Sequence, residues 1–426
     1  MTETKSHTSH TLKALTLATL ALPGVCSQTL ASEAEYFDVN TMFSRYSESG
    51  NRMKVDAYQA VVNIPISEKF KLKINGSKDI ISGASPVFYY RDNGQIKMEK
   101  SGASIREIRD AQEITGTYLH GDNSLNIKVG RSSENDYDSN YFNIGSRVEL
   151  DQKGTFVTTN YGFSSDQVWA VDQCHPKETL NNCINPIDFP GFTPQMNDGM
   201  YKRPGVGGDK TSHSGKLGIS QIIDENTQIH GNFSYTHNEG YLSDPYKLVF
   251  APGDTTSVIP PFYPHGFRHD TRPENREQFT ILGGYVQNFE EFNAAELHLD
   301  YRFYADTWGV NAHTFEFSWK QPLWFDWQLT PRARYYSQGS ADFYQLYLND
   351  DQLSNKYYSS DYRLASFGAY GGGVQLSKEV FENATLGFGI DFYDRKQSYG
   401  MNNTGKGTFQ DDYSFSMFSA NVKIIF

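Results

Sequence analysis

Apolar and polar residues alternate along the last stretch of the chain. Between Asp412 and Phe426, Phe418 and every second residue after it are apolar, whereas the residues between them include Asn421 and Lys423. Alternation with a period of two places successive side chains on opposite faces of a β-strand. A strand at the edge of a sheet exposes unpaired backbone groups, which favour aggregation unless another strand covers them. We therefore expect this strand to pair with the first strand of the chain and to close a β-barrel.

The same alternation marks sixteen segments in all, each at least ten residues long. A tilted strand of ~9–11 residues is enough to cross a bilayer. The segments are Tyr36–Tyr46, Met53–Ile66, Phe70–Ile80, Arg109–Leu119, Leu125–Glu134, Tyr141–Leu150, Thr155–Ser164, Ser212–Ile223, Thr227–His237, Arg276–Asn288, Ala294–Ala305, Gly309–Lys320, Phe325–Gln338, Arg363–Ser377, Thr385–Tyr399 and Asp412–Phe426.

The connections between these segments are sorted by length. Short turns alternate with eight connections on the other side, and the four longest all belong to that other side. These four are Ile81–Ile108, Ser165–Thr211, Glu239–Asn275 and Gly339–Tyr362. Short periplasmic turns opposite long extracellular loops are typical of outer-membrane barrels. The sequence therefore predicts a closed transmembrane antiparallel β-barrel of about 16 strands, with both termini in the periplasm and outer-membrane lipid around it.

The composition agrees with a barrel and argues against other classes. The chain has 28 Tyr, 29 Phe and 36 Gly, and its mean hydropathy of -0.59 excludes a bundle of spanning helices, each of which needs ~20 consecutive apolar residues. Barrels keep a low mean hydropathy because only alternate residues face lipid. The net charge of -12 and the absence of a basic run argue against nucleic acid as a partner.

The first 31 residues read as a secretory signal peptide. Lys5 and Lys13 are positive, Ala14–Val25 is a short apolar core, and Thr29–Ala31 is a small-residue cleavage site. Cys26 raises lipid attachment as an alternative, but the residues before it are a poor context for that modification. We expect residues 1–31 to be removed and residues 32–426 to form the barrel.

Only two cysteines follow the signal peptide. Cys174 and Cys183 lie in a long connection rich in Pro, Asn and Asp. In an oxidising compartment this spacing suits a disulfide within one loop. A metal pair completed by His175 is the weaker alternative, and no other metal site or cofactor is indicated.

Two predicted strands place charged residues on the face opposite the apolar one. Since a charge facing lipid at the bilayer centre costs ~2–4 kcal/mol, these polar residues should line the lumen. One interpretation is a charged constriction that selects solutes and whose arginines favour anions. The other is a ladder of salt bridges that fills a polar lumen. The residues concerned are Asp300, Arg302, Tyr304, Asp326, Arg332, Arg334 and Tyr336.

Aromatic residues and one histidine refine the outward face. Trp319, Trp324 and Trp327 surround one predicted periplasmic turn, where tryptophan suits the lipid–water interface. His313 interrupts the apolar alternation of Gly309–Lys320. Either a β-bulge or a position at the membrane rim accounts for it.

A series of short motifs resembles a known bacterial family. The motifs are Ser82–Pro86, Gly240–Lys247, Arg272–Arg276, Tyr301–Tyr304 with Asp306, Trp308–Val310, Ala312–Thr314, Gln321–Leu323, Thr330–Arg332, Arg334–Gln338 and Ala341–Tyr344. In this order they resemble domain-of-unknown-function family 3570, whose members are expected to be outer-membrane β-barrels of Gram-negative bacteria. The terminal strand ending in Phe426 resembles the signal read by the β-barrel assembly machinery. Genes near members of this family often encode a flavin transferase, a thioredoxin-like protein and a small lipoprotein.

Three functions are consistent with these features. The first is a porin-like channel for small polar solutes. The second is the barrel component of an export or electron-transfer assembly with periplasmic or lipoprotein partners, as the gene neighbourhood implies. The third is a barrel enzyme, which we do not expect, because the histidines are scattered and no nucleophile lies in a recognisable catalytic motif.

Overall fold

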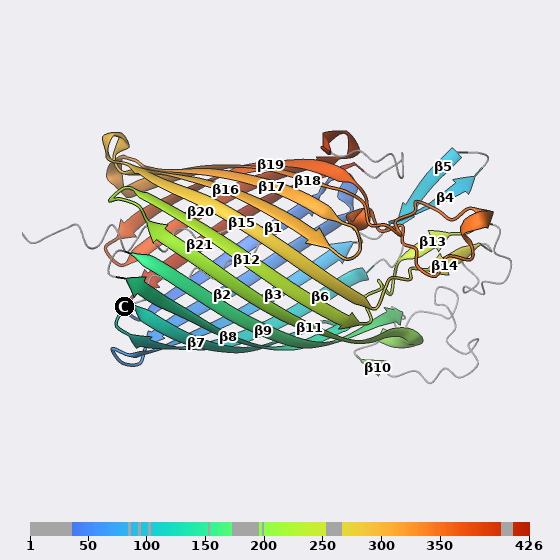
Figure 1. The fold of residues 1–426 in the computed structure, drawn as a ribbon, viewed down its shortest axis with the longest axis horizontal. Helices are drawn as coiled ribbons and strands as arrows, with labels where there is room; N and C mark the ends of the chain where they lie inside the picture. Colours follow the sequence, from blue (N-terminus) through green and yellow to red (C-terminus); the bar gives the residue numbers. More distant parts are fainter. Residues whose placement is uncertain are drawn as a thin grey trace, which may run out of the picture.

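The computed structural model describes residues 36–83, 87–92, 95–100, 104–151, 154–172, 196–197, 200–252, 266–401 and 412–426. Within them, sixteen long antiparallel strands follow one another around a closed barrel (Figure 1). These strands are β1 Asp38–Glu48, β2 Met53–Pro65, β3 Phe70–Gly83, β6 Ser104–His120, β7 Asn123–Ser133, β8 Tyr137–Asp151, β9 Thr155–Asp172, β11 Met200–Ile222, β12 Thr227–Gly240, β15 Asn275–Phe289, β16 Ala295–Asp306, β17 Asn311–Pro322, β18 Trp327–Gln338, β19 Phe367–Phe381, β20 Ala384–Lys396 and β21 Tyr413–Ile425.

All sixteen segments expected from the alternation are strands of this barrel, so the predicted fold class is confirmed. The boundaries differ most at β9 and β11, which extend beyond the predicted Thr155–Ser164 and Ser212–Ile223. Their pairing continues past a register shift to Tyr201 opposite Asp172. Because β9 and β11 keep pairing beyond the predicted segment ends, the hydrophobic pattern alone did not mark where these two strands end.

The remaining elements are short and lie in the connections. The strands are β4 Val87–Asp92, β5 Gln95–Lys100, β10 Met196–Asn197, β13 Leu248–Phe250 and β14 Phe267–His269. The 3₁₀ turns are η1 Ser49–Asn51, η3 Glu290–Phe292, η4 Trp324–Asp326, η5 Asp350–Gln352, η6 Tyr362–Leu364 and η7 Gln397–Tyr399. Among the described residues, no helix has the length and apolar character needed to span a bilayer.

The last strand closes the barrel against the first. β21 pairs with β1 from Ile425 opposite Asp38 to Phe415 opposite Glu48. Phe426 extends this seam, because its backbone N–H donates to the carbonyl of Phe37 at 2.8 Å. The edge that the terminal strand would otherwise expose is therefore paired with β1 from Phe415 to its end.

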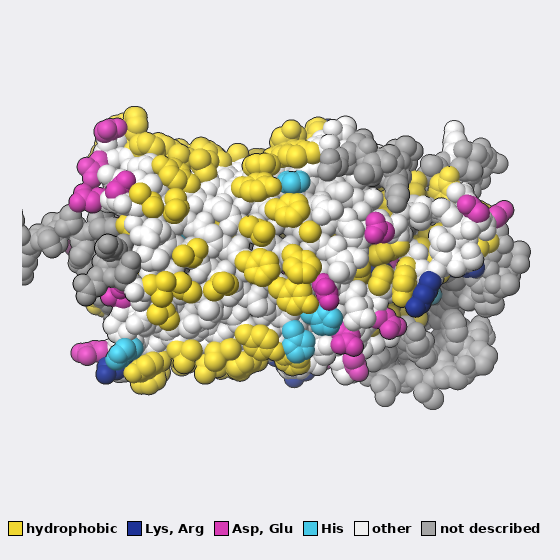
Figure 2. All heavy atoms as spheres, in the orientation of Figure 1, with side chains coloured by type: hydrophobic (Ala, Val, Ile, Leu, Met, Phe, Trp, Pro, Cys, Tyr) yellow, Lys and Arg dark blue, Asp and Glu magenta, His cyan; other side chains and the backbone are white. Residues whose placement is uncertain are grey.

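The two faces of each strand differ as the alternation predicts. On β7, Leu125, Ile127 and Val129 are exposed on the outside of the barrel, whereas Lys128 between them is 7% exposed and lies in the lumen. Figure 2 shows hydrophobic side chains along the barrel and acidic side chains at both ends of this face. This surface is suited to a bilayer, in which polar side chains at mid-depth are costly.

The tryptophans of the predicted belt lie at the end of the barrel that carries the short turns. Trp319 faces outward and contacts the rings of Phe289 and Phe292, with ring centres 5.4 and 6.2 Å away. Trp324 is 83% exposed in the η4 turn. These positions suit anchoring at the periplasmic interface of the bilayer.

His313 needs no bulge. The pairing of β16 with β17 keeps one register from Glu296 opposite Lys320 to Ala305 opposite Asn311. His313 lies within this ladder on the outward face, where its Nδ1 shares a hydrogen bond of 2.8 Å with the hydroxyl of Tyr301. The bulge alternative is wrong, and the interruption is one polar ring among outward aromatic side chains.

Candidate functional site in the lumen and at its mouth

The lumen wall carries ion pairs that cross over an intervening strand. Arg332 on β18 reaches Asp391 on β20, with Nη2 and Oδ1 2.7 Å apart. Strands are ~4.8 Å apart, so the two backbones are separated by roughly 10 Å. Gly373 of β19 lies between them, and a Cβ there would be 2.2 Å from Asp391 Oδ1. The glycine is what lets the arginine lie across the middle strand.

A second pair has the same construction. His230 on β12 and Asp300 on β16 approach to 3.1 Å between Nε2 and Oδ1. Gly284 of β15 separates them, and a Cβ at that position would be 2.0 Å from the His230 ring and 2.2 Å from Asp300. Lumenal glycines therefore create the space in which charged side chains find partners two strands away.

Further lumenal charges are paired between neighbouring strands. Arg334 Nε lies 3.1 Å from Glu316 Oε1, and Lys128 Nζ lies 3.2 Å from Glu113 Oε2. Pairing lowers the cost of placing these groups in a partly enclosed wall, because each charge is compensated locally. Two of the three arginines expected to favour anions thus face carboxylates directly.

The other residues predicted to line the lumen differ in their surroundings. The hydroxyl of Tyr304 donates to Asp306 at 2.7 Å, and that of Tyr336 donates to Gln338 at 2.6 Å. Asp326 was expected at the start of a lumenal strand, but it is the last residue of the exposed η4 turn, with φ of 61°. The strand starts only at Trp327, because the turn uses Phe325 and Asp326 in the left-handed conformation.

Arg302 is the exception among the lumenal arginines. It faces the lumen on β16, opposite Leu282 and Thr314 of the neighbouring strands. No carboxylate of the described residues lies within 4.0 Å of its guanidinium. Lys216 on β11 likewise has no carboxylate of the described residues within 4.0 Å. The charge of Arg302 acts on Lys216. Sequence reasoning omitted Lys216, although its place between outward Gly215 and Leu217 assigns it to the lumen.

Several partners were also missed at the sequence level. Asp391, Glu316 and His230 each alternate with outward apolar neighbours and could have been assigned to the lumen from that pattern. Alternation gives the face but not the partner, since it fixes neither the register between strands nor which side chains can reach across a glycine. Cys174 and Cys183, like residues 1–31, lie outside the described residues.

Three connections meet beyond the strand ends and form what we call the cap. It consists of the β4–β5 hairpin, residues 241–252 with 266–274, and residues 339–366 (Figure 1). Tyr89 of the hairpin packs with Leu346 and Tyr362, and Tyr90 packs against Phe250 with ring centres 6.4 Å apart. Tyr89 is fully buried although it belongs to a loop. The cap thus has small apolar cores of its own.

The three connections emerge from well-separated points of the barrel rim. They join β3 to β6, β12 to β15 and β18 to β19, which stand at places 3–4, 9–10 and 13–14 in the circular order of sixteen strands. The hairpin therefore starts almost opposite the other two. Because it contacts both, the cap extends across the mouth of the barrel.

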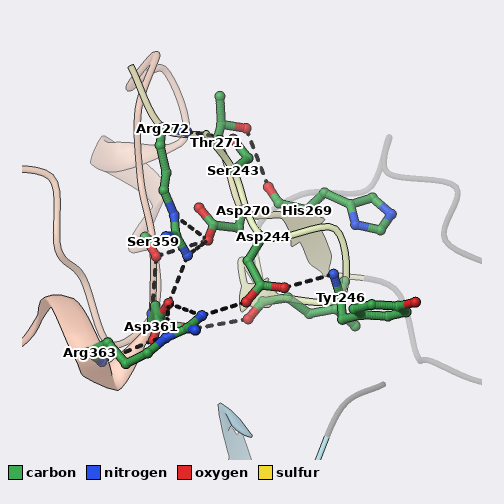
Figure 3. Close-up of polar contacts among 12 residues, drawn as sticks. Ser243, Asp244, Tyr246, His269, Asp270, Thr271, Arg272, Ser359, Asp361 and Arg363 are labelled. Carbon is green, nitrogen blue, oxygen red and sulfur yellow. Dashed lines mark hydrogen bonds and ion pairs between the residues drawn. The ribbon is translucent and has the colours of Figure 1, made fainter. Parts of the chain in front are cut away.

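A charged network joins the two longer cap segments (Figure 3); Asp270 and Asp361 are buried, whereas the Arg363 side chain is 59% exposed. Arg272 contacts Asp270 in its own segment and Asp361 in the other, the latter at 2.8 Å. Arg363 contacts Asp361 and, across the segments, Asp244 at 2.6 Å. Asp244 Oδ1 also accepts from the backbone N–H of Tyr246 at 3.0 Å, which forms a turn at Ser243–Tyr246.

Burial shifts the proton affinities of this network. It raises the pKa of Asp270 to about 6, against the opposing effect of Arg272. It lowers the pKa of Lys247 to about 8, against the opposing effect of Asp361 and Asp244. Burial alone would raise the pKa of Asp361, but the guanidinium groups of Arg363 and Arg272 hold it well below its usual value.

The cap is attached to the barrel wall through Tyr362. Arg395 of β20 donates from Nη2 to the carbonyl of Tyr362 at 2.6 Å and stacks over the ring of Phe367 at 3.8 Å. Arg395 and Arg52 both lie over the ring of Tyr362, at 4.9 and 5.6 Å from its centre. Gln338 adds a hydrogen bond of 2.7 Å to the carbonyl of Ala365. These contacts hold the cap on one side of the mouth.

The described residues contain no group of three or more His, Cys, Asp and Glu side chains that could hold a metal ion.

Fold and site together define the class of this protein. A closed β-barrel with an apolar outer surface, a polar lumen and a folded extracellular cap is a protein of the bacterial outer membrane.

The family follows from the sequence profile that matches this chain. The profile described as "Protein of unknown function (DUF3570)" matches residues 12–413, and the chain belongs to that family. The resemblance carried by the motifs of the strands and loops is thereby confirmed. No curated protein matches the sequence significantly.

Several solved structures are similar at low sequence identity. A bacterial polysaccharide outer membrane secretin aligns with a TM-score of 0.47 and 7% identity, covering 92% of this chain and 98% of the other. The CymD monoaromatic hydrocarbon channel aligns with a TM-score of 0.42 and 8% identity, covering 93% and 90%. A loop-deletion variant of OmpT from Vibrio cholerae aligns with a TM-score of 0.41 and 6% identity, covering 92% and 98%.

Proposed function

We propose that the protein is a channel for small polar solutes whose extracellular mouth is controlled by the cap. The observation that carries this proposal is the polar wall of a closed sixteen-strand barrel. Barrels of 16–18 strands are wide enough to leave an aqueous channel. Lumenal Asn143 and Asn160 bond to each other at 2.6 and 2.8 Å, and charged residues pair along the wall, so the lining suits water rather than apolar filling.

The cap gives the channel a narrow entrance. Its cores are small and its segments are held together by a few buried contacts around Arg272, Asp361 and Tyr362. Opening the cap requires these contacts to break, but every strand of the barrel can stay paired. A solute that passes must therefore be small, or the cap must move aside.

The experiment is conductance of the purified protein in a planar bilayer. We expect discrete conductance steps from the wild type, and larger or more frequent openings from Tyr362→Ala, because that ring joins the cap to Arg395 of the wall and to Arg52 of the β1–β2 connection. Phe381→Ala is a suitable control, since Phe381 is exposed at a short turn on the opposite end. Absence of conductance from both the wild type and Tyr362→Ala would overturn the proposal.

The cap also favours a second candidate. A mouth covered from three sides suits a barrel component of an export or electron-transfer assembly, opened or completed by a periplasmic or lipoprotein partner. This candidate predicts that a partner co-purifies from native membranes and that conductance appears only when it is present. A barrel that conducts alone and purifies alone counts against it.

A further inference from the structure

Two cations lie in neighbouring rows of the lumen wall, Lys216 in one and Arg302 in the next. Lys216 of β11 lies opposite Ser234 of β12, Ser234 lies opposite Thr280 of β15, and Thr280 lies opposite Tyr304 of β16. Arg302 is two residues from Tyr304 on the same lumenal face. Ser234 and Thr280 therefore place hydroxyls beside Lys216 on the side towards Arg302, whose directly opposite residue on β15 is Leu282.

These two cations differ from the other basic residues around them. Lys210 on the same strand is 3.2 Å from Asp166, and Arg334 is 3.1 Å from Glu316. Among the described residues, Lys216 and Arg302 have no carboxylate within 4.0 Å. The carboxylates next to Arg302 in register are Glu316 on β17 and Asp300, two residues away on β16, and they already contact Arg334 and His230. Lys216 and Arg302 thus keep their charges without a carboxylate partner of their own among the described residues.

The spacing suits one small anion. Three strand intervals of ~4.8 Å and an offset of two residues, ~7 Å along the strand, separate the backbones of Lys216 and Arg302 by roughly 16 Å. Lysine and arginine side chains each extend about 6 Å, so their charged ends approach from both sides of the Ser234 and Thr280 hydroxyls. Ammonium, guanidinium and hydroxyl groups all donate hydrogen bonds, which an oxyanion accepts.

We propose that Lys216, Arg302, Ser234 and Thr280 form a binding site for a small oxyanion, such as phosphate or a carboxylate, within the lumen. If the protein is the channel proposed above, small oxyanions are its solute class, and the role of the site rests on that proposed function. Binding of the anion itself does not require conduction. Two like charges repel in the empty site, and an anion between them removes that repulsion. Charge in an enclosed wall acts on a passing ion at short range, whereas charge on the outer rim is screened beyond a Debye length of ~8 Å.

The test is equilibrium dialysis of radiolabelled inorganic phosphate against the detergent-solubilised full chain. We expect saturable binding, weakened at least ~tenfold by Lys216→Met or Arg302→Met, since a hydrogen bond to a charged group contributes that much or more. Lys73→Met is the matched control, because Lys73 of β3 also faces the lumen without a carboxylate within 4.0 Å among the described residues. It removes the same charge from a distant part of the wall and should change affinity less than ~twofold. Lys216→Arg should retain binding.

Conductance separates this inference from the proposed function. In a conducting wild type, phosphate should block chloride current saturably, and Lys216→Met should relieve the block. Equal effects of Lys216→Met and Lys73→Met on binding, or no saturable binding at millimolar phosphate, would overturn the site while leaving the channel intact. Saturable phosphate binding without conductance would overturn the channel while leaving the site intact.

Discussion

At the scale of single residues, glycine decides how charge is arranged in this lumen. Gly373 and Gly284 lie between partners on the strands to either side, and a methyl group at either position would occupy the space of an aspartate oxygen. Arginine, histidine and aspartate can therefore meet across two strand intervals. A wall lined only with larger residues would confine each charge to its own strand and its immediate neighbours.

Adjacent glycines on opposite faces of β15 provide a direct test. Gly284→Ala should destabilise the barrel by roughly 1–3 kcal/mol, because the new methyl collides with His230 and Asp300 and separates them. Gly283→Ala should be neutral or slightly stabilising, since nothing lies within 4 Å of that position and alanine loses less chain entropy than glycine. The measurement is the urea midpoint of unfolding in lipid vesicles, followed by tryptophan fluorescence. Equal midpoints for the two variants would contradict the role given to Gly284.

At the scale of elements, the alternation within each strand sets which side chains face outward and which face the lumen. The barrel is closed by a seam between the first strand, β1, and the last, β21. β21 pairs with β20 along one edge and with β1 along the other. The contact continues past the strand itself, because the rings of Phe426 and Phe37 pack with centres 5.2 Å apart. The chain end thus contributes both a backbone hydrogen bond and an aromatic contact to closure.

Deleting Phe426 should lower the amount of assembled barrel in the outer membrane several-fold. The deletion removes the last hydrogen bond and ring contact of the seam and also the terminal aromatic residue that resembles an assembly signal. The measurement is the heat-modifiable mobility of the protein in outer-membrane fractions on a gel. Phe381→Ala removes an exposed aromatic residue at the same end without touching the seam, so it should assemble normally. A deletion variant that assembles as well as this control would refute the prediction.

At the scale of the whole molecule, the cap joins three distant parts of the barrel rim, and we expect its opening to depend on pH. The pKa of Asp270 is raised to about 6 in the closed cap, so the closed cap binds this proton more tightly than an exposed aspartate does. Lowering the pH from 7 towards 4 therefore stabilises closure, by at most roughly 3 kcal/mol. The pKa of Lys247 is lowered to about 8, so raising the pH from 7 towards 10 also stabilises closure.

Channel opening should therefore be most frequent near neutral pH and should fall on both sides of it. Asp270→Asn should remove the decline on the acidic side, and Lys247→Met should remove the decline on the alkaline side. Asp361 contributes only at lower pH, because its pKa is held well below the usual value. Open probability in planar bilayers between pH 4.5 and 9.5 measures both effects. An unchanged acidic decline in Asp270→Asn would assign the decline to groups other than Asp270.

The sequence by itself determined the strands, their outward and lumenal faces and the side on which the long loops lie. Alternation is a local property, so the outward Leu125 and the lumenal Lys128 follow directly from their places along one strand. It also located Arg302, Arg332 and Arg334 on the lumenal face. It failed at Asp326, where a tight turn uses residues that continue the alternation.

Only the tertiary structure decided the partners and the cap. Arg332 finds its aspartate 59 residues away, and Arg272 finds Asp361 89 residues away. The first pair depends on the register between strands and on the space left by Gly373, and the second depends on how two cap segments pack; neither has a local signature. The same holds for three connections that meet across the mouth, because their contacts arise from the circular closure that brings distant rim positions together.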